Sequence, residues 1–437
     1  MSLAVEALPA PMPERHRAII AGIAGNVMEW YDFSVYGYFA SVLGRQFFPT
    51  QNPTSSLLAA FGVFAAGFLM RPIGSLLFGH IGDKLGRKLA LTSSAGLMAV
   101  PTFLIGLLPT YHQVGIAAPI LLALLRLVQG LSVGGEYTTS GIFLVERGVP
   151  GRRGFLGSFA ELGATGGVLL GSAVGAVITT MCSTSAVAGW GWRLAFALGL
   201  GVGVFALAIR RLLLDDRAAP GGMLPEASPL RAAFGTEWRA ILRVVAFNAA
   251  GAVSYYMCFV YVTTYLRQID FVSASKALDI NTIAIVSLLL AIIPLASLSD
   301  RIGRKPVLLF ATGGMFVLAW PLFWMMHHSA IAVILAGQIG FALLNAGFWG
   351  PNSATMVELV PPRARCTVVS VGYNLGMALL GGATPAVAVY TVERSRDDLS
   401  PAFLLMAAAA ISFVVILRMR ESSRLDLRAA EAGPRVS

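Results

Sequence analysis

The sequence predicts an all-α integral membrane protein with twelve transmembrane helices in two six-helix halves. Three observations support this fold class. The 437-residue chain is 56% hydrophobic and only 12% charged, about half of the roughly 25% charged residues found in soluble domains. Its apolar residues form runs of about 20, the length that an α-helix needs to cross a bilayer. A charged loop motif also occurs twice, half a chain apart.

The apolar runs are continuous, which favours helices over a membrane β-barrel, whose strands are about ten residues long and alternate in polarity. The mean hydropathy of +0.74 agrees with many buried or lipid-facing segments. We place the twelve helices at residues 18–44, 57–79, 89–109, 117–145, 154–181, 192–212, 239–266, 277–298, 306–326, 330–357, 366–391 and 401–418.

A polar segment separates the two halves. It is rich in proline, glycine and charged residues, a composition typical of a linker outside the membrane. The predicted organisation is a tail at 1–17, a six-helix bundle at 18–212, a linker at 213–238, a second six-helix bundle at 239–418 and a tail at 419–437.

The Lys and Arg residues are unequally distributed between the two sides of the membrane. Of the 32 in the chain, 24 fall on the side of the tails and linker, six fall on the other side and two lie inside predicted helices. Because cytoplasmic loops carry the excess of positive charge, we expect a multi-pass protein of the bacterial inner (plasma) membrane with both termini cytoplasmic. The first helix is too long and too acidic for a cleaved signal peptide, so we expect it to be retained. The net charge of +10 then reflects topology and lipid contact, and predicts no nucleic-acid partner.

The repeated loop motif reads GHIGDKLGRK at 79–88 and ASLSDRIGRK at 296–305, joining the second and third helices of each half. Its glycines let helices end close together, its acid can face a helix N-terminus, and its basic residues stay on the cytoplasmic side. We expect the two copies to form a cytoplasmic gate. The residues concerned are Gly79, Asp83, Gly86, Arg87, Lys88, Asp300, Arg301, Gly303 and Arg304.

The repeated G-x-x-x-D-[RK]-x-G-R-K pattern resembles the signature loop of the major facilitator superfamily. Further stretches resemble its metabolite:proton symporter family: GNVMEWYDF at 25–33, FAAGFLMRPIGSLLFGHIGDKLGRK at 64–88, RLVQGLSVGGEYTTS at 126–140 and GWGWRLAFALG at 189–199. The resemblance implies the major facilitator fold and proton-coupled import by alternating access. It also implies a substrate that is an organic acid, such as α-ketoglutarate, citrate or shikimate, or a zwitterion such as proline or betaine.

The chain lacks sequence features of three related groups of transporters, and this narrows the choice of family. The chain reads RRLLLDDRAAP after the sixth helix, where sugar porters carry a PESPR-like stretch. Its fifth helix has no glycine-proline signature of the drug/proton antiporters. After Arg420 there are no sustained heptads, so the osmolyte carrier that has a long C-terminal coiled coil fits less well.

Five ionisable side chains of the first half stand out deep inside predicted helices: Glu29, Asp32, Arg71, Arg126 and Glu136. Each would cost about 2.5–3.5 kcal/mol at a helix centre, so these groups should pair, face a water-filled cavity or hold a proton. Helical phase puts Glu29 on one stripe of the first helix with Asp32 at its edge, and Arg126 and Glu136 on one stripe of the fourth.

Other small and polar residues follow the same stripes. Asn26 and Tyr36 share the stripe of Glu29, and Gln129 shares that of Arg126. Gly130 and Gly134 form a small-residue stripe suited to close helix contact. Two polar faces of different helices can therefore converge on one cavity.

The chemistry of the five groups suggests their roles. A buried carboxyl can bind and release a proton near neutral pH, so Glu29, Asp32 and Glu136 are proton-coupling candidates. Arginine presents a planar charged fork to a carboxylate. The resemblance associates Arg126 with proton transfer. We expect Arg71 and Glu29 nearest the substrate and Arg126 with Glu136 in coupling. The alternative is ion pairs that only set helix register, most plausibly for Asp32. Three further acids, Glu146, Glu161 and Glu358, are weaker candidates, with Glu161 lining the cavity.

The second half offers neutral groups, which hydrogen-bond a carboxylate without adding charge. Packing or an interfacial belt is the alternative role for any one aromatic residue. The complete set of expected substrate-binding residues is Asn26, Glu29, Tyr36, Arg71, Gln129, Tyr255, Tyr256, Asn345, Trp349, Asn352, Tyr373 and Asn374.

The expected function is secondary active import of a small mono-, di- or tricarboxylic acid with protons. The alternatives are a proton-coupled carrier of a zwitterionic osmolyte such as proline or betaine, and, ranked below it, a non-transporting membrane receptor. GLSVG at 130–134 matches a hydrolase motif, but it lies in a helix without His and Asp partners, so we expect no enzyme. The cysteine pattern predicts no metal site. We expect a monomer without cofactor, driven by the proton gradient, whose partners are the substrate, protons and the lipid bilayer.

Overall fold

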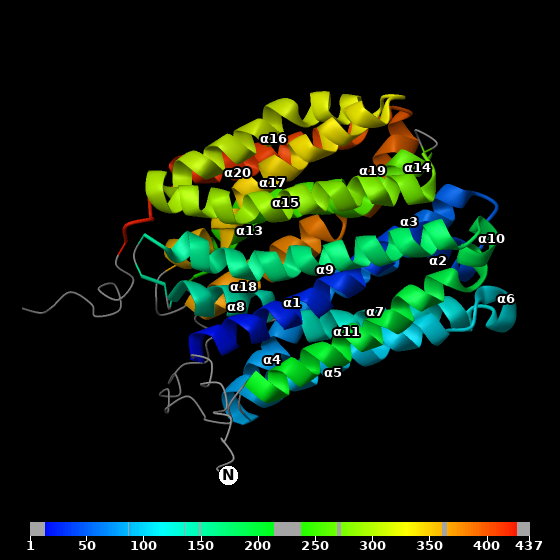
Figure 1. Cartoon of the computed structure of the whole chain (residues 1–437), viewed down its shortest axis with the longest axis horizontal. Coiled ribbons are helices and arrows are strands. Elements are labelled where there is room, and N and C mark those ends of the chain that lie inside the picture. The colour runs from blue at the N-terminus through cyan, green and yellow to red at the C-terminus, as the bar shows by residue number, and fades with distance from the viewer. Residues whose placement is uncertain are drawn as a thin grey trace, which may run out of the picture.

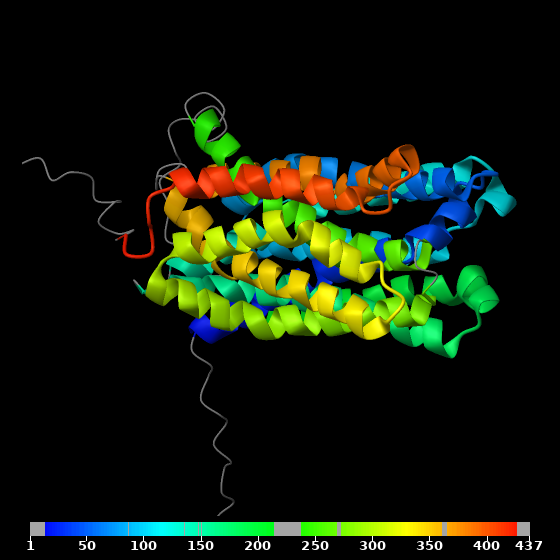
Figure 2. The same ribbon diagram turned by 90° about the horizontal axis from the view of Figure 1, so that it is seen from above.

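The computed structural model describes residues 14–85, 87–134, 136–146, 148–149, 151–213, 237–268, 272–360 and 365–425. Over these ranges the chain folds into long helices that run side by side along the long axis of the molecule (Figures 1 and 2). In Figure 1, α15, α16 and α20 of the second half lie above α1, α5 and α11 of the first half.

Twelve short and long helical segments make up the first half. They are α1 (Glu14–Tyr38), α2 (Ala40–Phe47), α3 (Pro53–Leu69), α4 (Arg71–Leu85), α5 (Arg87–Leu107), α6 (Tyr111–Val114), α7 (Ala117–Val133), α8 (Glu136–Glu146), α9 (Arg153–Met181), α10 (Thr184–Ala186), the π-helix η1 (Val187–Gly191) and α11 (Trp192–Leu213).

The second half has the same character. Its segments are α13 (Trp238–Tyr256), the π-helix η2 (Met257–Tyr261), α14 (Val262–Gln268), α15 (Ala274–Ile302), α16 (Arg304–Met326), α17 (Ile331–Leu359), α18 (Arg365–Gly376), the π-helix η4 (Met377–Gly381), α19 (Thr384–Ser395) and α20 (Ser400–Arg418).

By length and apolar composition, ten helical segments of the described chain could cross a membrane. Together with α1 and α5 they give the twelve predicted helices, so the predicted fold class is confirmed. Several predicted spans are interrupted. The second divides into α3 and α4 at Met70, where Pro72 has no N–H to bond the carbonyl of Phe68.

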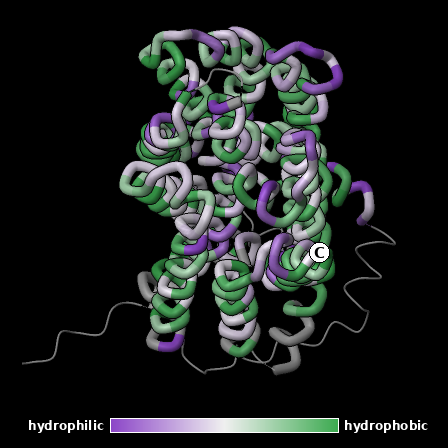
Figure 3. The backbone as a smooth tube through the Cα atoms, turned by 90° about the vertical axis from the view of Figure 1, so that its right-hand side faces the viewer, coloured by the Kyte–Doolittle hydropathy of each residue, from purple (hydrophilic) through white to green (hydrophobic). Residues whose placement is uncertain are grey.

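The outer surface of the bundle is apolar. Leu290, Phe310 and Val317 are 73%, 77% and 66% exposed, which suits side chains that face lipid. In Figure 3, which looks along the helices, most of the described chain is green or pale, and purple is confined to short stretches. Polar and charged side chains that water would otherwise solvate are turned inward, and this concentrates the chemistry of the protein between the helices.

The glycine stripe of the fourth predicted helix makes the close contact expected of it. A Cβ on Gly130 would lie 1.9 Å from the carbonyl oxygen of Gly67, and one on Gly134 would lie 2.1 Å from the backbone nitrogen of Ser75. Any larger residue would force α7 away from α3 and α4. This backbone contact holds Arg126 of α7 close to Arg71 of α4 and to α1.

The two halves touch at both ends of the bundle. At one end, which we name the Asp300 end, the Asp300 carboxylate accepts a 2.9 Å hydrogen bond from the backbone N–H of Gly154. At the opposite end, Asn281 donates to the Tyr38 hydroxyl at 2.9 Å. Helices α9 and α15 lie side by side between these contacts (Figure 1). The structure is therefore closed at both ends.

Candidate substrate and proton site

Two buried ion pairs join α1 to its neighbours. Nη2 of Arg71 donates to Oε1 of Glu29 at 2.7 Å, and Nη1 of Arg126 donates to Oδ2 of Asp32 at 2.6 Å. All four side chains are buried. Pairing offsets much of the cost of placing each charge away from water, and the four charges cancel.

The partner of Arg126 differs from the expected one. We expected Glu136, but Arg126 pairs with Asp32, which lies inside the site and not at its margin. The phase argument assumed one continuous helix over 117–145, whereas the structure divides it into α7 and α8. The side chain of Glu136 lies outside the described residues.

A hydrogen-bond network holds the Asp32 carboxylate. Its Oδ1 accepts from Gln129 Nε2 at 2.7 Å and from Thr102 Oγ1 at 2.8 Å, and Arg126 Nη1 also donates to Gln129 Oε1 at 2.8 Å. Sequence reasoning missed Thr102, since a single threonine in an apolar helix is an unremarkable pattern. Three side chains thus hold the Asp32 carboxylate, which fixes α1, α5 and α7 relative to one another, while Nε and Nη2 of Arg126 have no hydrogen-bond partner among the described residues.

Aromatic rings surround both guanidinium groups. Arg126 Cζ lies 4.4 Å from the ring centre of Tyr36 and 5.0 Å from that of Phe33, while Arg71 Cζ lies 5.0 Å from that of Phe68. These distances allow cation–π attraction. The Tyr36 hydroxyl is already hydrogen-bonded to the backbone carbonyl of Ala60, so Tyr36 contacts Arg126 through its ring.

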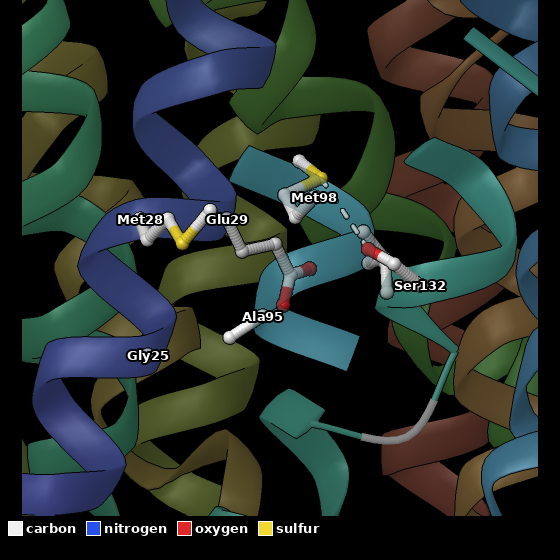
Figure 4. A pocket seen from close by; sticks show the side chains of 7 residues that line it. Gly25, Met28, Glu29, Ala95, Met98 and Ser132 are labelled. Atoms are coloured by element: carbon white, nitrogen blue, oxygen red, sulfur yellow. Dashed lines mark hydrogen bonds between the residues drawn. The ribbon is translucent and has the colours of Figure 1, made fainter. Parts of the chain in front are cut away.

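Arg71 keeps hydrogen-bonding capacity. Within the described chain, its Nε and Nη1 have no hydrogen-bond partner. Glu29 borders a cavity of about 10 Å³ with Gly25, Met98 and Ser132 (Figure 4), room for about one water molecule. The site is thus closed around its charges, and a substrate enters only when the helices separate.

A third carboxyl lies at the centre of the bundle. Glu161 on α9 is 2% exposed and accepts hydrogen bonds from the Tyr137 hydroxyl at 2.8 Å and Thr165 Oγ1 at 3.0 Å. Among the described residues no basic side chain pairs with it. The sequence ranked Glu161 among the weaker candidates. In the structure, Glu29 and Asp32 are paired with arginines, whereas Glu161 is hydrogen-bonded only by hydroxyl groups of the described chain.

Aromatic side chains from both halves gather beside Glu161. Trp30 of α1 lies edge-on to Tyr137 at 6.4 Å and to Tyr255 at 5.3 Å between ring centres. Tyr137 stacks on Tyr373 of α18 at 4.8 Å. Trp30 and Tyr137 were missed in the sequence, although both directly follow an acid already singled out, in MEWYDF and GGEYTT.

The remaining predicted substrate residues divide into two groups. Asn345 is occupied locally, because it accepts from Ser254 at 2.8 Å and donates to the carbonyl of Phe341. The second group is buried and keeps a polar atom without a hydrogen-bond partner in the described chain. These atoms are Oδ1 of Asn26, Asn352 and Asn374, Nε1 of Trp349 and the hydroxyls of Tyr255, Tyr256 and Tyr373.

The gate residues of the second half form a compact ion cluster. Arg304 Nη1 lies 2.8 Å from Asp300 Oδ1, and Arg304 Nε lies 3.3 Å from Glu358 Oε2. Gly303 adopts a φ of +108°, a conformation that favours glycine, and Arg301 is exposed. The expected gate residues of the first half (Gly79, Asp83, Gly86, Arg87 and Lys88) lie outside the described side chains.

Comparison with known proteins gives consistent results. The family model described as "Sugar (and other) transporter" matches residues 17–216, and that of the Major Facilitator Superfamily matches 268–436. The chain is 35% identical over 426 residues to the glycine betaine/proline/ectoine/pipecolic acid transporter OusA of Dickeya dadantii (strain 3937), covering 95% of this chain and 85% of that protein.

Two further relatives carry similar names. A proline/betaine transporter of Escherichia coli (strain K12) is 34% identical over 95% of this chain and 85% of its own length. A putative proline/betaine transporter of Staphylococcus aureus (strain COL) is 37% identical over 92% of this chain and 87% of its own length.

Solved structures share the fold. The proton:xylose symporter XylE bound to 6-bromo-6-deoxy-D-glucose superposes with a TM-score of 0.76 at 16% identity, over 96% of this chain and 98% of that one. A bacterial homologue of the human lysosomal transporter Spinster gives a TM-score of 0.66 at 15% identity, over 95% of this chain and all of that one (100%).

Proposed function

Because this chain belongs to the major facilitator superfamily and to its proton symporters, we propose that it imports zwitterionic solutes of the proline and betaine type together with protons. This is the alternative that the sequence left open, and it replaces the organic acid as the preferred substrate class. The names of relatives that the chain matches over most of their length support it.

The charge balance of the site carries the proposal. Arg71 and Arg126 are already paired with Glu29 and Asp32, and Glu161 adds one further acid. An organic anion would meet a centre with no surplus positive charge among its described residues. A zwitterion brings an ammonium group for the surplus carboxylate and a carboxylate for the unused N–H groups of Arg71.

Transport then follows alternating access between the two halves. The contacts at both ends fit an intermediate between outward-open and inward-open states. A proton on Glu29 or Asp32 would weaken an ion pair with arginine, and this links proton binding to helix movement. In this proposal the carrier is a monomer of the bacterial inner membrane, with both termini cytoplasmic and the proton gradient as its energy source.

Uptake into proteoliposomes tests the proposal. Purified protein is reconstituted, and uptake of labelled betaine and proline is compared with that of citrate and α-ketoglutarate, with and without an inward proton gradient. We expect betaine or proline uptake that accelerates with the gradient and returns to the basal rate with a protonophore. Preferential uptake of the carboxylates, or indifference to the gradient, would overturn it. Counterflow of labelled betaine separates a carrier from a receptor.

A further inference from the structure

Glu161 is the central carboxylate that has no arginine partner among the described residues. Its hydrogen-bond partners are the neutral hydroxyls of Tyr137 and Thr165. An ionised carboxylate this deeply buried is unfavourable unless a positive charge joins it. In the working carrier, Glu161 therefore takes a cation or a proton.

The surroundings of Glu161 suit an organic cation. Tyr137, which donates to Glu161, lies with its ring centre 6.4 Å from that of Trp30, and Trp30 lies 5.3 Å from Tyr255. Tyr373 stacks on Tyr137. Aromatic faces attract quaternary and other methylated ammonium groups through the ring quadrupole. A proton needs no such rings, so the aromatic surround favours the ammonium group.

Several buried hydrogen-bond donors in this cluster have no acceptor among the described residues. The indole N–H groups of Trp30 and Trp349 and the hydroxyl of Tyr373 have no hydrogen-bond partner among the described residues, and all three side chains are at least 97% buried. A buried polar group without a partner is unfavourable. A polar ligand between these side chains would satisfy such groups.

Tyr256 connects this cluster to Arg71. Its ring centre lies 6.1 Å from that of Trp30 and 5.2 Å from that of Phe68, and the Phe68 ring in turn lies 5.0 Å from Arg71 Cζ. Neighbouring rings thus connect the aromatic cluster to the Arg71 guanidinium.

We infer that Glu161, with the rings of Trp30, Tyr137, Tyr255 and Tyr373, forms the subsite for the methylated ammonium group of the substrate, while Arg71 receives its carboxylate. The inference rests on the proposed function and names the group that binds each end. Trp30, Tyr137 and Glu161 come from the first half, and Tyr255 and Tyr373 from the second. Separating the halves opens the subsite, and closing them completes it.

The experiment compares betaine with 3,3-dimethylbutyrate, which has the same shape but a carbon in place of the charged nitrogen. Counterflow of labelled betaine is measured at equal pH on both sides, with unlabelled 3,3-dimethylbutyrate as competitor. Glu161→Gln should raise the half-saturation concentration for betaine at least about tenfold, while inhibition by 3,3-dimethylbutyrate changes less than about threefold. Glu393→Gln, at an exposed acid on α19, should behave as the wild type.

The remaining outcomes distinguish failure of the proposed function from failure of the Glu161 subsite. If the wild type gives no betaine or proline counterflow, the proposed function fails. If the wild type transports betaine and Glu161→Gln keeps its half-saturation concentration, the inference fails alone. If Glu161→Gln keeps betaine affinity but loses acceleration by a proton gradient, Glu161 is the proton site and the inference is overturned.

If the Glu161→Gln protein does not fold, a second pair of variants at Trp30 tests the same inference. Trp30→Phe keeps an aromatic face and should retain betaine affinity within about threefold, whereas Trp30→Leu should lose about tenfold. Equal affinities of the two variants would contradict the ammonium subsite, since a hydrophobic packing role treats Phe and Leu alike.

Discussion

Asp300 of the second half accepts a 2.9 Å hydrogen bond from the backbone N–H of Gly154 in the first half. Its other oxygen accepts from the N–H of Phe155 at 2.8 Å, so one carboxylate binds the N-terminus of α9, where the helix dipole favours negative charge. Arg304 holds the same carboxylate from its own half. Closure of the Asp300 end thus depends on one acid.

Asp300→Asn should weaken that closure, because it removes the charge from two charge-assisted hydrogen bonds and from the pair with Arg304. We expect the open state at this end to become about tenfold more populated. The labelling rate of Ser353→Cys, buried between the halves, measures it in a cysteine-free background. Asp279→Asn, exposed on the same helix α15, is the control, and equal rates in the two variants would contradict the role of Asp300.

Asp32→Asn should destabilise the protein strongly, since it leaves Arg126 buried without a charge partner. Breaking such a pair costs about 3–5 kcal/mol, and the midpoint of thermal unfolding in detergent should fall. The double variant Asp32→Asn/Arg126→Gln should be more stable than Asp32→Asn, because no uncompensated charge remains. Additive losses in the double variant would show that the two side chains act independently.

Arg71→Lys should raise the half-saturation concentration for betaine at least about tenfold, because lysine keeps the charge but lacks the guanidinium fork that would bind the substrate carboxylate. Reconstituted uptake measures the change. Arg45→Lys, at an exposed arginine, should leave uptake at the wild-type level. An unchanged half-saturation concentration in Arg71→Lys would place the carboxylate elsewhere.

Glu421 should make stability depend on acidic pH. Burial alone would raise the pKa of Glu421, but N–H donors of Ser423, Arg304 and Lys305 outweigh it and lower that pKa below its usual value. A carboxyl whose pKa is lowered by folding contributes stability above its unfolded pKa of roughly 4.3, and this contribution is lost as the pH falls through the folded value.

The measurement for Glu421 is the thermal midpoint between pH 7 and pH 3. Glu421→Gln should be less stable than the wild type at pH 7, and the two should converge below about pH 4. Glu393→Gln, exposed and distant along the chain, should show no such convergence. A constant difference between Glu421→Gln and wild type across this range would contradict an electrostatic role.

The site was only partly predictable. Glu29 and Arg71 were placed together near the substrate from sequence, and they form an ion pair. The pairing of Arg126 with Asp32 was not predicted, because helical phase is reliable only within one continuous helix and says nothing of how α7 is rotated relative to α1. Glu161 was underrated, since nothing local shows that a carboxyl lacks a basic partner on another helix.

The sequence by itself determined the helices, their number, the repeat of the two halves and the family, because hydrophobicity and periodicity are local properties that the bilayer selects directly. The tertiary structure alone decided which charges meet. Pairing depends on how each helix rotates and how closely it approaches its neighbour, and contacts such as that of Gly130 with Gly67 set both. Such packing joins residues far apart in the chain, so Asp32 pairs with Arg126, whereas Glu161 has no basic partner among the described residues.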